Sequence, residues 1–396
     1  MDAKNAPLAK TYRAILSRNG GQPSARTEVA ESFSVNDHGA APVDQTMEKS
    51  REFLCKQIEE LSGNRADLKM MVDDILKAGK NALNAVYADD DNFLSRNPKS
   101  VSCLEVIVRT DGSRPSFVVQ NGKVNKNSSP IGEWESILDQ YENEISHAVS
   151  SVGRVDVDGV PMGTGFLIHE KLVLTNRHVL QAIATKENDG RWLVDPKATI
   201  DFGLEFRGKA SHNKCRFKQV LYSGPSYIDP EKIDHNKLDL ALMEVEPGPD
   251  YQPTFFYFDS STDWATGDSY IFTIGYPANP GFDGLRNYNT LLEQIFKSTF
   301  DCKRFAPGKI LNGSPSDVPG RLRHDATTLG GNSGSVIVVA TRATVAAGLH
   351  YGGTLKAPRE NWGHVLGEIL TKSSGTTDQN LKQYLEEWKV KLVDRF

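Results

Sequence analysis

The sequence predicts a mainly β protein built from two six-stranded antiparallel barrels, preceded by a helical N-terminal region and closed by a C-terminal helix. Between about residues 151 and 370, short apolar segments are separated by glycine and proline, and no long helical pattern interrupts them. This spacing is typical of β-sandwiches and barrels. The segments fall into two sets of six, which indicates two barrels rather than one sheet. Apolar residues at helical spacing lie before and after this region.

The expected strands divide into barrel one, at about 151–250, and barrel two, at about 265–370. The first set covers 152–158, 163–169, 171–175, 198–204, 214–222 and 238–245. The second set covers 269–275, 290–300, 320–326, 335–340, 344–350 and 362–366. Apolar residues at helical spacing in 380–392 predict an amphipathic helix that closes the unit. We therefore expect 151–396 to form one domain.

The region before this domain is expected to be helical after a flexible tail. Residues 1–43 are polar and without periodicity, which predicts the tail. Residues 44–90 carry two runs of helical spacing separated by Ser62-Gly63-Asn64, which predicts a helical hairpin. Two interpretations of this hairpin stay open: a structural extension, or a regulatory or adaptor module that binds a protein partner.

Residues 100–150 are expected to hold a β-hairpin and a helix that lead into the first barrel. Apolar and polar residues alternate over 104–108, Asp111-Gly112 provides a turn, and the apolar run 116–119 follows. This order predicts two paired strands. The segment 134–149 has helical spacing and leads directly into the first strand of barrel one.

Composition excludes several classes of function. A net charge of −5 with 24% charged residues argues against an electrostatic nucleic-acid surface. No run approaches the length of about 20 apolar residues that a membrane helix needs, and the N-terminus lacks the apolar core of a secretory signal. Four cysteines, Cys55, Cys103, Cys215 and Cys302, have no metal-ligand spacing and indicate reduced thiols. We expect a cytoplasmic protein that binds neither membrane nor nucleic acid and has no metal or cofactor.

The segment Gly330-Gly331-Asn332-Ser333-Gly334-Ser335 makes Ser333 a candidate nucleophile. Glycine at 331 and 334 allows positive φ and lets a substrate carbonyl approach the main chain. The N–H groups of Gly331 and Ser333 could then converge on one point as an oxyanion hole. Most glycine- and serine-rich turns are ordinary loops, so this motif requires partners elsewhere in the chain.

Two further residues supply those partners. A serine hydroxyl is a poor nucleophile at neutral pH unless a neutral imidazole accepts its proton and a carboxylate orients that imidazole. His178 follows the apolar strand 171–175, where Thr175 or Asn176 could cap a short helix. Asp239 is the polar residue of the apolar segment 237–242, and an aspartate in such a segment needs a partner. We expect His178, Asp239 and Ser333 to act together.

The motifs Gly-Thr-Gly-Phe, Leu-Thr-Asn-Arg-His-Val, Leu-Asp-Leu-Ala-Leu and Gly-Gly-Asn-Ser-Gly-Ser resemble those of the trypsin-like, chymotrypsin-fold serine peptidases. They are most similar to the bacterial glutamyl-endopeptidase-like and high-temperature-requirement-type branches, and the resemblance covers about 150–370. It implies two barrels of the chymotrypsin type with the site in the cleft between them. The segment 114–122 is also similar to an element of other bacterial trypsin-like proteins, which implies that this hairpin belongs to the peptidase module.

The same resemblance implies a substrate pocket lined by Thr328, His350, Tyr351 and Gly352. Thr328 and His350 resemble the pair with which glutamyl endopeptidases hold an acidic side chain, and both can donate hydrogen bonds to a carboxylate. The alternative is a small apolar pocket in which His350 is structural. Tyr351 and Gly352, with Gly353, are expected to offer backbone pairing to an extended peptide.

Together these observations predict a serine endopeptidase that cleaves selected protein or peptide substrates, after Glu or Asp, through an acyl-enzyme. Asn332 cannot form the ion pair that an aspartate at this place makes with a freshly cut N-terminus in trypsin-type zymogens, so that route of activation is not expected. A protease inside the cell must spare its host, which favours limited cleavage in signalling or defence. The alternatives are a catalytically silent peptidase fold that serves as a binding or adaptor protein, and an esterase with the same residues.

Overall fold

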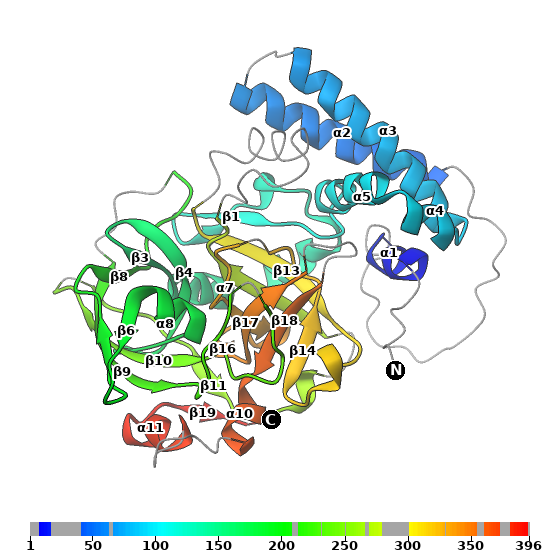
Figure 1. Ribbon diagram of the computed structural model, residues 1–396. Helices are drawn as coiled ribbons and strands as arrows, with labels where there is room; N and C mark the ends of the chain where they lie inside the picture. Colours follow the sequence, from blue (N-terminus) through cyan, green and yellow to red (C-terminus); the bar gives the residue numbers. More distant parts are fainter. Residues whose placement is uncertain are drawn as a thin grey trace.

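The computed structural model describes residues 8–16, 41–62, 66–207, 213–230, 232–249, 251–265, 269–278, 301–328, 330–354, 360–372 and 381–394. Two β-barrels lie side by side, and a group of helices from the N-terminal part of the chain lies beside the second barrel, next to β1 and β13 (Figure 1).

Barrel one closes in the strand order β10-β5-β4-β3-β8-β9, with every neighbour antiparallel. The strands are β3 (Val152–Val157), β4 (Val160–His169), β5 (Leu172–Thr175), β8 (Ala198–Asp201), β9 (Lys214–Ser223) and β10 (Ala241–Pro247). Its interior is filled by buried apolar side chains that include Val155, Leu167, Val173, Ile200 and Met243. Between β5 and β8 the chain forms α8 (Arg177–Ile183) and the small ribbon of β6 (Ala184–Lys186) and β7 (Trp192–Val194).

Barrel two follows the order β12-β15-β17-β18-β14-β13, and the pairing of β12 with β13 closes it. The strands are β12 (Tyr270–Gly275), β13 (Arg304–Leu311), β14 (Arg321–His324), β15 (Val336–Val339), β17 (Gly348–Gly353) and β18 (Asn361–Val365). All of these pairings are antiparallel. The prediction of a mainly β chain with two six-stranded antiparallel barrels is confirmed.

One strand of barrel two was not anticipated. The strand expected at 290–300 lies outside the described residues, and β13 (Arg304–Leu311) takes a place in the barrel. Pro307 and Gly308 in the middle of β13 argue against a strand, because proline cannot donate to the ladder and glycine lacks a side chain to pack. The structure shows why glycine is needed there: a Cβ at Gly308 would lie 2.5 Å from the backbone nitrogen of Ala326.

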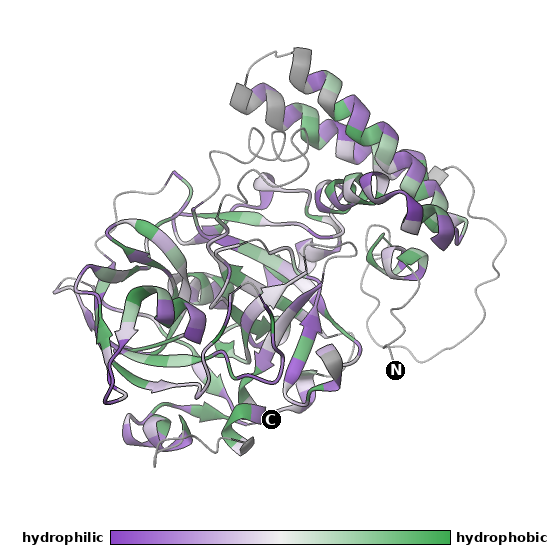
Figure 2. Ribbon diagram, viewed as in Figure 1, coloured by the Kyte–Doolittle hydropathy of each residue, from purple (hydrophilic) through white to green (hydrophobic). Residues whose placement is uncertain are grey.

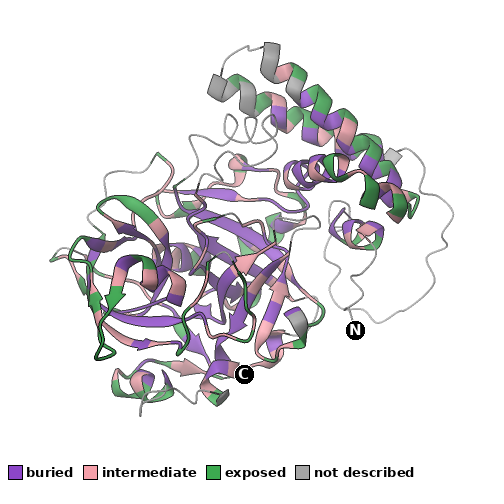
Figure 3. Cartoon of the chain, in the orientation of Figure 1, coloured by how far each residue is buried: buried purple, intermediate pink, exposed green. Residues whose placement is uncertain are grey.

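The N-terminal region contains five helices in the described residues. They are α1 (Leu8–Leu16), α2 (Ala41–Ser62), α3 (Ala66–Tyr87), α4 (Asp91–Arg96) and α5 (Pro98–Thr110). Helices α2 and α3 occupy the segment for which a helical hairpin was expected. Exposed polar residues alternate along them with buried apolar ones, whereas the strands of both barrels are buried along most of their length (Figures 2 and 3).

The expected β-hairpin strand at 104–108 is wrong, because these residues belong to α5. Residues 103–108 are all buried, and the buried Glu105, which accepts the Tyr12 hydroxyl, interrupts their apolar run. A buried helix therefore produced the alternation that resembled a strand. The hairpin lies one segment later, where β1 (Phe117–Gln120) pairs with β2 (Lys123–Val124) around Asn121-Gly122. Because β1 also pairs with β13, this hairpin extends the sheet of barrel two.

The prediction of a flexible tail over 1–43 is wrong for residues 8–16, which form α1. Its buried residues Ala9, Tyr12, Ile15 and Leu16 lie on one face, and they pack with residues of α3, α4 and α5 in a separate apolar cluster. This nine-residue stripe is too short to stand out in a polar segment.

Replacing Tyr12 by phenylalanine is expected to lower the free energy of unfolding by about 1–3 kcal/mol. The Tyr12 hydroxyl donates to Glu105 Oε1 at 2.6 Å, and both residues are buried, so removing the donor leaves a buried carboxylate oxygen with a lost hydrogen bond. Urea unfolding followed by circular dichroism measures the effect. Tyr257→Phe, at a side chain 36% exposed, is the control, and equal midpoints for both variants would contradict the expectation.

The segment before barrel one is helical, and the segment after barrel two contains both helices and a strand. Helices α6 (Glu135–Gln140) and α7 (Glu142–Ser150) occupy the helical segment expected at 134–149. The closing helix expected at 380–392 is shorter, since α11 (Leu381–Glu387) ends early and β19 (Leu392–Val393) pairs in parallel with β11 (Tyr257–Asp259). Two smaller elements complete this edge, β16 (Val345–Ala346) and α10 (Leu366–Lys372).

The four cysteines lie in the described part of the chain, and each has a free thiol. Three of them are buried, and burial raises the pKa of the thiols of Cys103, Cys215 and Cys302. No helix in the described ranges is long and apolar enough to cross a membrane.

Candidate active site

His178 is held at the beginning of α8, immediately after the end of β5. Asn176 occupies the N-cap position but makes no capping hydrogen bond with its side chain. Its amide donates instead to the Asp239 carbonyl at 2.8 Å, and the Thr175 hydroxyl donates to the Thr164 carbonyl at 2.7 Å. The two polar residues expected to cap the helix therefore fasten it to neighbouring segments and fix the position of His178.

Asp239 contacts His178 at two points. Its Oδ1 accepts the backbone N–H of His178 at 2.9 Å, and its Oδ2 lies 2.6 Å from the ring nitrogen Nδ1. The Asp239 side chain is only 6% exposed, because it lies just before β10 under the rim of the barrel. A carboxylate fixed at both oxygens determines the orientation of the imidazole.

His364 joins this carboxylate to barrel two, and sequence reasoning assigned it no role. The backbone N–H of Asp239 donates to His364 Nε2 at 3.1 Å. Burial, followed by the nearby Arg321 guanidinium, lowers the pKa of the His364 ring well below its ordinary value, so the ring is neutral and its Nε2 can accept. No local pattern could have revealed this contact, since the two residues are 125 positions apart.

The loop around Ser333 has the backbone shape that its glycines predict. Gly331 has φ +85° and Gly334 has φ +89°. Thr164 of β4 clamps the loop, because its N–H donates to the Ser333 carbonyl and its hydroxyl donates to the Gly331 carbonyl, each at 2.8 Å. On the other side, the Gly334 N–H donates to the His350 carbonyl at 3.1 Å. Ser333 is therefore positioned by both barrels.

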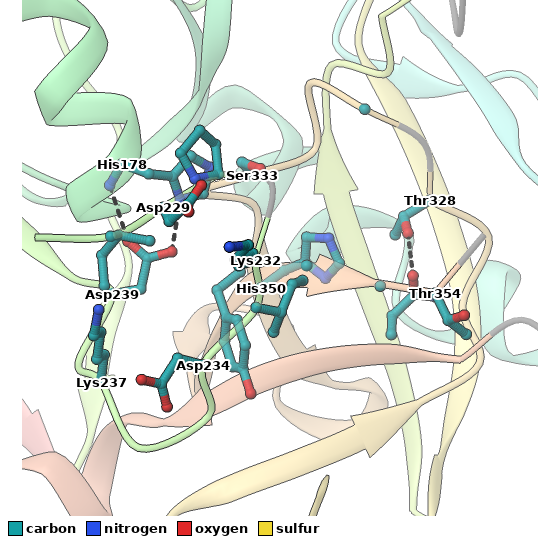
Figure 4. Close-up of a pocket in the computed structure, with 18 of the residues that line it drawn as sticks. His178, Asp229, Lys232, Asp234, Lys237, Asp239, Thr328, Ser333, His350 and Thr354 are labelled. Atoms are coloured by element: carbon teal, nitrogen blue, oxygen red, sulfur yellow. Dashed lines mark hydrogen bonds and ion pairs between the residues drawn. The ribbon is translucent and has the colours of Figure 1, made fainter. Parts of the chain in front are cut away.

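His178, Asp239 and Ser333 line the same pocket, and Figure 4 shows His178 between Asp239 and Ser333. Within the described structure the Ser333 hydroxyl makes no hydrogen bond to the His178 ring. Such bonds often shorten only when a substrate binds. The backbone N–H groups of Gly331 and Ser333 also donate to no described residue. Both can therefore donate a hydrogen bond to a substrate oxygen.

The pocket has a volume of about 230 Å³ and extends from His178 to Thr328 and Asn361. The four predicted substrate-binding residues Thr328, His350, Tyr351 and Gly352 all line it. The Thr328 hydroxyl donates to Asn361 Oδ1. Tyr351 is held between barrels, with its hydroxyl 2.8 Å from His235 Nδ1 and its ring stacked on His364.

His350 is buried and neutral. Burial, followed by the neighbouring His324 and His178, lowers the pKa of its ring well below the ordinary value. His350 Nδ1 lies 3.2 Å from His324 Nε2, and burial lowers the pKa of His324 to about 3. This pair can exchange hydrogen bonds, but it brings no positive charge to the pocket.

One wall of the pocket is formed by the segment 228–239. Gly352 lies against this segment, because a Cβ on Gly352 would come within 2.7 Å of Ile233 Cδ1. The carboxylates among the described lining residues, Asp229, Asp234 and Asp239, all belong to it. Figure 4 shows them on the side of His178, with Thr328 and Thr354 on the opposite side.

Arg109 and Arg114, which sequence reasoning did not assign to a site, also line the pocket. Arg109 lies in the last turn of α5 and Arg114 in the segment that follows it. The only signal was the resemblance of the segment 114–122 to an element of other bacterial trypsin-like proteins. In the described residues, no group of three or more His, Cys, Asp or Glu side chains is arranged to hold a metal ion.

Comparison with known proteins agrees with this architecture. Residues 163–346 match the family described as trypsin-like peptidase domain. A probable serine protease of Lysobacter enzymogenes is 28% identical over 357 residues, which cover 83% of this chain and 89% of that protein.

Solved structures give weaker likenesses. A Glu endopeptidase in complex with MPD aligns with a TM-score of 0.38 and 16% identity over 55% of this chain and 85% of that chain. The inactive form of the Rv3671c protease of M. tuberculosis H37Rv aligns with a TM-score of 0.35 and 17% identity over 58% and 89%. The family match, which covers most of barrel one and part of barrel two, identifies residues 163–346 as a trypsin-like peptidase domain, in agreement with the similarity of the chain to a probable serine protease.

Proposed function

We propose that this protein is a serine endopeptidase whose catalytic residues are Ser333, His178 and Asp239. The observation that carries the proposal is the two-point contact of Asp239 with His178 beside Ser333 in one pocket. With Nδ1 facing the carboxylate, the imidazole keeps its proton there and presents Nε2 as the base. Asp239 stabilises the imidazolium that forms when the base accepts a proton.

The reaction proceeds through an acyl-enzyme. Ser333 Oγ bonds to the scissile carbonyl carbon while its proton moves to His178 Nε2, and the carbonyl oxygen becomes an oxyanion held by the amides of Gly331 and Ser333. Collapse breaks the C–N bond as His178 gives its proton to the leaving amine. Water then attacks the ester by the same route and releases the acid product and the serine hydroxyl.

The proposed substrate is an extended peptide with Glu or Asp before the scissile bond. Its backbone pairs with β17 at Tyr351 and Gly352, along the edge that pairs with no other described strand there, opposite the wall formed by the segment 228–239. Its acidic side chain enters the pocket toward Thr328 and His350. The His350 ring can donate a hydrogen bond to it, and the Thr328 hydroxyl can donate once it turns away from Asn361 Oδ1. A side-chain amide or hydroxyl would accept fewer hydrogen bonds there than a carboxylate does.

We place this activity in the cytoplasm, as limited cleavage of selected proteins in signalling or defence. Four unpaired cysteines in the described part of the chain fit a reducing compartment. The N-terminal helical region is the proposed surface for a protein partner, because it lies outside the two barrels and beside the second one (Figure 1).

The test is labelling of the intact protein by a fluorophosphonate probe. Wild type is expected to react, and Ser333→Ala to lose both labelling and peptide hydrolysis, with a fall in kcat on the order of 10⁶-fold. Ser95→Ala, at an exposed serine of α4, is the matched control and should label normally. Wild type that neither labels nor cleaves indicates a silent binding protein, and turnover of small esters without peptides indicates an esterase.

A further inference from the structure

We propose that Arg109 is a specificity-determining residue that binds the carboxylate of a Glu or Asp side chain preceding the scissile bond. The N-terminal helical region then supplies part of the substrate pocket, and a peptidase domain without this region would lack that part of the pocket. The inference rests on the proposed function and adds the charged group that selects the substrate. Arg109 lies outside the residues that match the peptidase family.

The first support is the way that the end of α5 is fastened to the pocket. Arg114 Nε donates to the Asp325 carbonyl at 2.6 Å, and the Thr327 hydroxyl donates to the Arg114 carbonyl at 2.8 Å. The chain folds back between these anchors, since the Arg114 N–H donates to the Val108 carbonyl. These bonds hold the last turn of α5 against the segment that ends in Thr328, and they bring Arg109 to the pocket lining.

The second support is the distribution of charge. Arg114 is 1% exposed and lies 3.5 Å from the Glu105 carboxylate, which also accepts the Tyr12 hydroxyl. The Arg109 guanidinium lines the pocket together with that of Arg114, and the carboxylates among the described lining residues all belong to the segment 228–239. A guanidinium binds a carboxylate through two parallel hydrogen bonds, which a lysine or a neutral donor cannot do.

The third support is the neutrality of His350. Because its ring and that of His324 are buried and uncharged, the two histidines can donate hydrogen bonds but cannot distinguish Glu from the isosteric Gln by charge. Thr328 and Asn361 are neutral as well. A cation in the lining adds discrimination by charge between the acid and its amide, and Arg109 is a cation of that lining.

The experiment compares full-length wild type with Arg109→Gln on two peptides that differ only in Glu or Gln before the scissile bond. Wild type should prefer Glu, and Arg109→Gln should lower the Glu:Gln ratio of kcat/KM by about 10- to 100-fold, the range for a hydrogen bond to a charged group. Labelling of Arg109→Gln by the fluorophosphonate shows that the variant is folded and that Ser333 still reacts. Arg96→Gln, at an exposed arginine of α4, should leave the ratio unchanged.

The outcomes separate the two proposals. An unchanged Glu:Gln ratio in a labelled Arg109→Gln enzyme overturns the inference and leaves the proposed function standing. Wild type that does not react at Ser333 overturns the proposed function itself. If Arg109→Gln does not fold, Arg109→Lys keeps the charge without the planar fork, and it should lower the ratio only in part.

The pH dependence of wild-type selectivity is a second measurement that needs no variant. The charged and titratable groups in the described lining of this pocket, besides Arg109, are Arg114, His178, Asp229, Lys232, Asp234, Lys237, Asp239, His350 and Tyr351. Glu105 contacts Arg114, and His324 contacts His350. Since the pKa of both histidine rings is lowered, they stay neutral at and above pH 6, and an arginine stays charged. The Glu:Gln ratio should therefore be constant from pH 6 to about 9. A ratio that falls through pH 6 to 7 would assign selection to a protonated histidine and overturn the inference.

Discussion

Asp239→Asn is expected to lower kcat by about 10⁴-fold on every peptide that the enzyme cleaves, and to leave KM and folding nearly unchanged. The asparagine can still accept the His178 backbone N–H through its oxygen, as Oδ1 does now at 2.9 Å. Its NH₂ group then faces Nδ1, where Oδ2 now lies 2.6 Å away. Two donors cannot share this contact, so the ring places its proton on Nε2 and can no longer accept the proton of Ser333.

Steady-state hydrolysis, with thermal unfolding of the same preparations, measures this effect. Asp234→Asn is the matched control, because Asp234 is an exposed carboxylate that lines the same pocket and does not contact His178. It should retain kcat within a few-fold. A loss of only a few-fold in Asp239→Asn, with folding intact, would mean that Asp239 does not orient the base.

The barrels and the candidate catalytic residues could be predicted from sequence because their signals are local. Each strand of barrel one is a short apolar run bounded by turn residues, and these runs carry their own periodicity. The glycines around Ser333 are required by a positive φ at two positions. His178 and Asp239 are polar residues at the ends of apolar strands, where the two side chains can contact each other without disturbing the core.

The predictions that were wrong or missing concern elements and contacts that tertiary structure determines. Residues 103–108 of helix α5 are all buried and five of them are apolar, and a short, mostly apolar run fits a buried helix and a strand equally well. The strand β13 contains Pro307 and Gly308, which locally oppose the pairing that the closed barrel imposes. No periodicity indicates that Arg109 lines the same pocket as Tyr351, Gly352 and Asn361, which follow it by more than 200 residues. Nor does any indicate that His364 Nε2 accepts a hydrogen bond from the Asp239 N–H.

Replacing Gly334 by alanine is expected to lower kcat by at least 10²-fold and to destabilise the fold by about 2–4 kcal/mol. Gly334 has φ +89°, which costs a non-glycine residue about 1 kcal/mol or more. A Cβ there would also clash with the Thr164 carbonyl and lie 2.7 Å from Thr175 Oγ1. Relieving the clash moves the loop away from β4, which breaks the Thr164 clamp and displaces Ser333, and a displacement of about 1 Å is enough for such a loss.

Gly190→Ala separates the clash from the backbone strain. Gly190 has the same φ of +89°, but a Cβ there meets no atom within 4 Å, so this variant should lose about 1 kcal/mol of stability and no activity. Peptide hydrolysis and chemical unfolding of the two variants are compared side by side. If Gly334→Ala retains full activity beside Gly190→Ala, the contact with Thr164 does not position the nucleophile. If activity is lost while stability matches the control, the small shift of Ser333 itself is responsible, because the strain is equal in both variants and only the contact with barrel one differs.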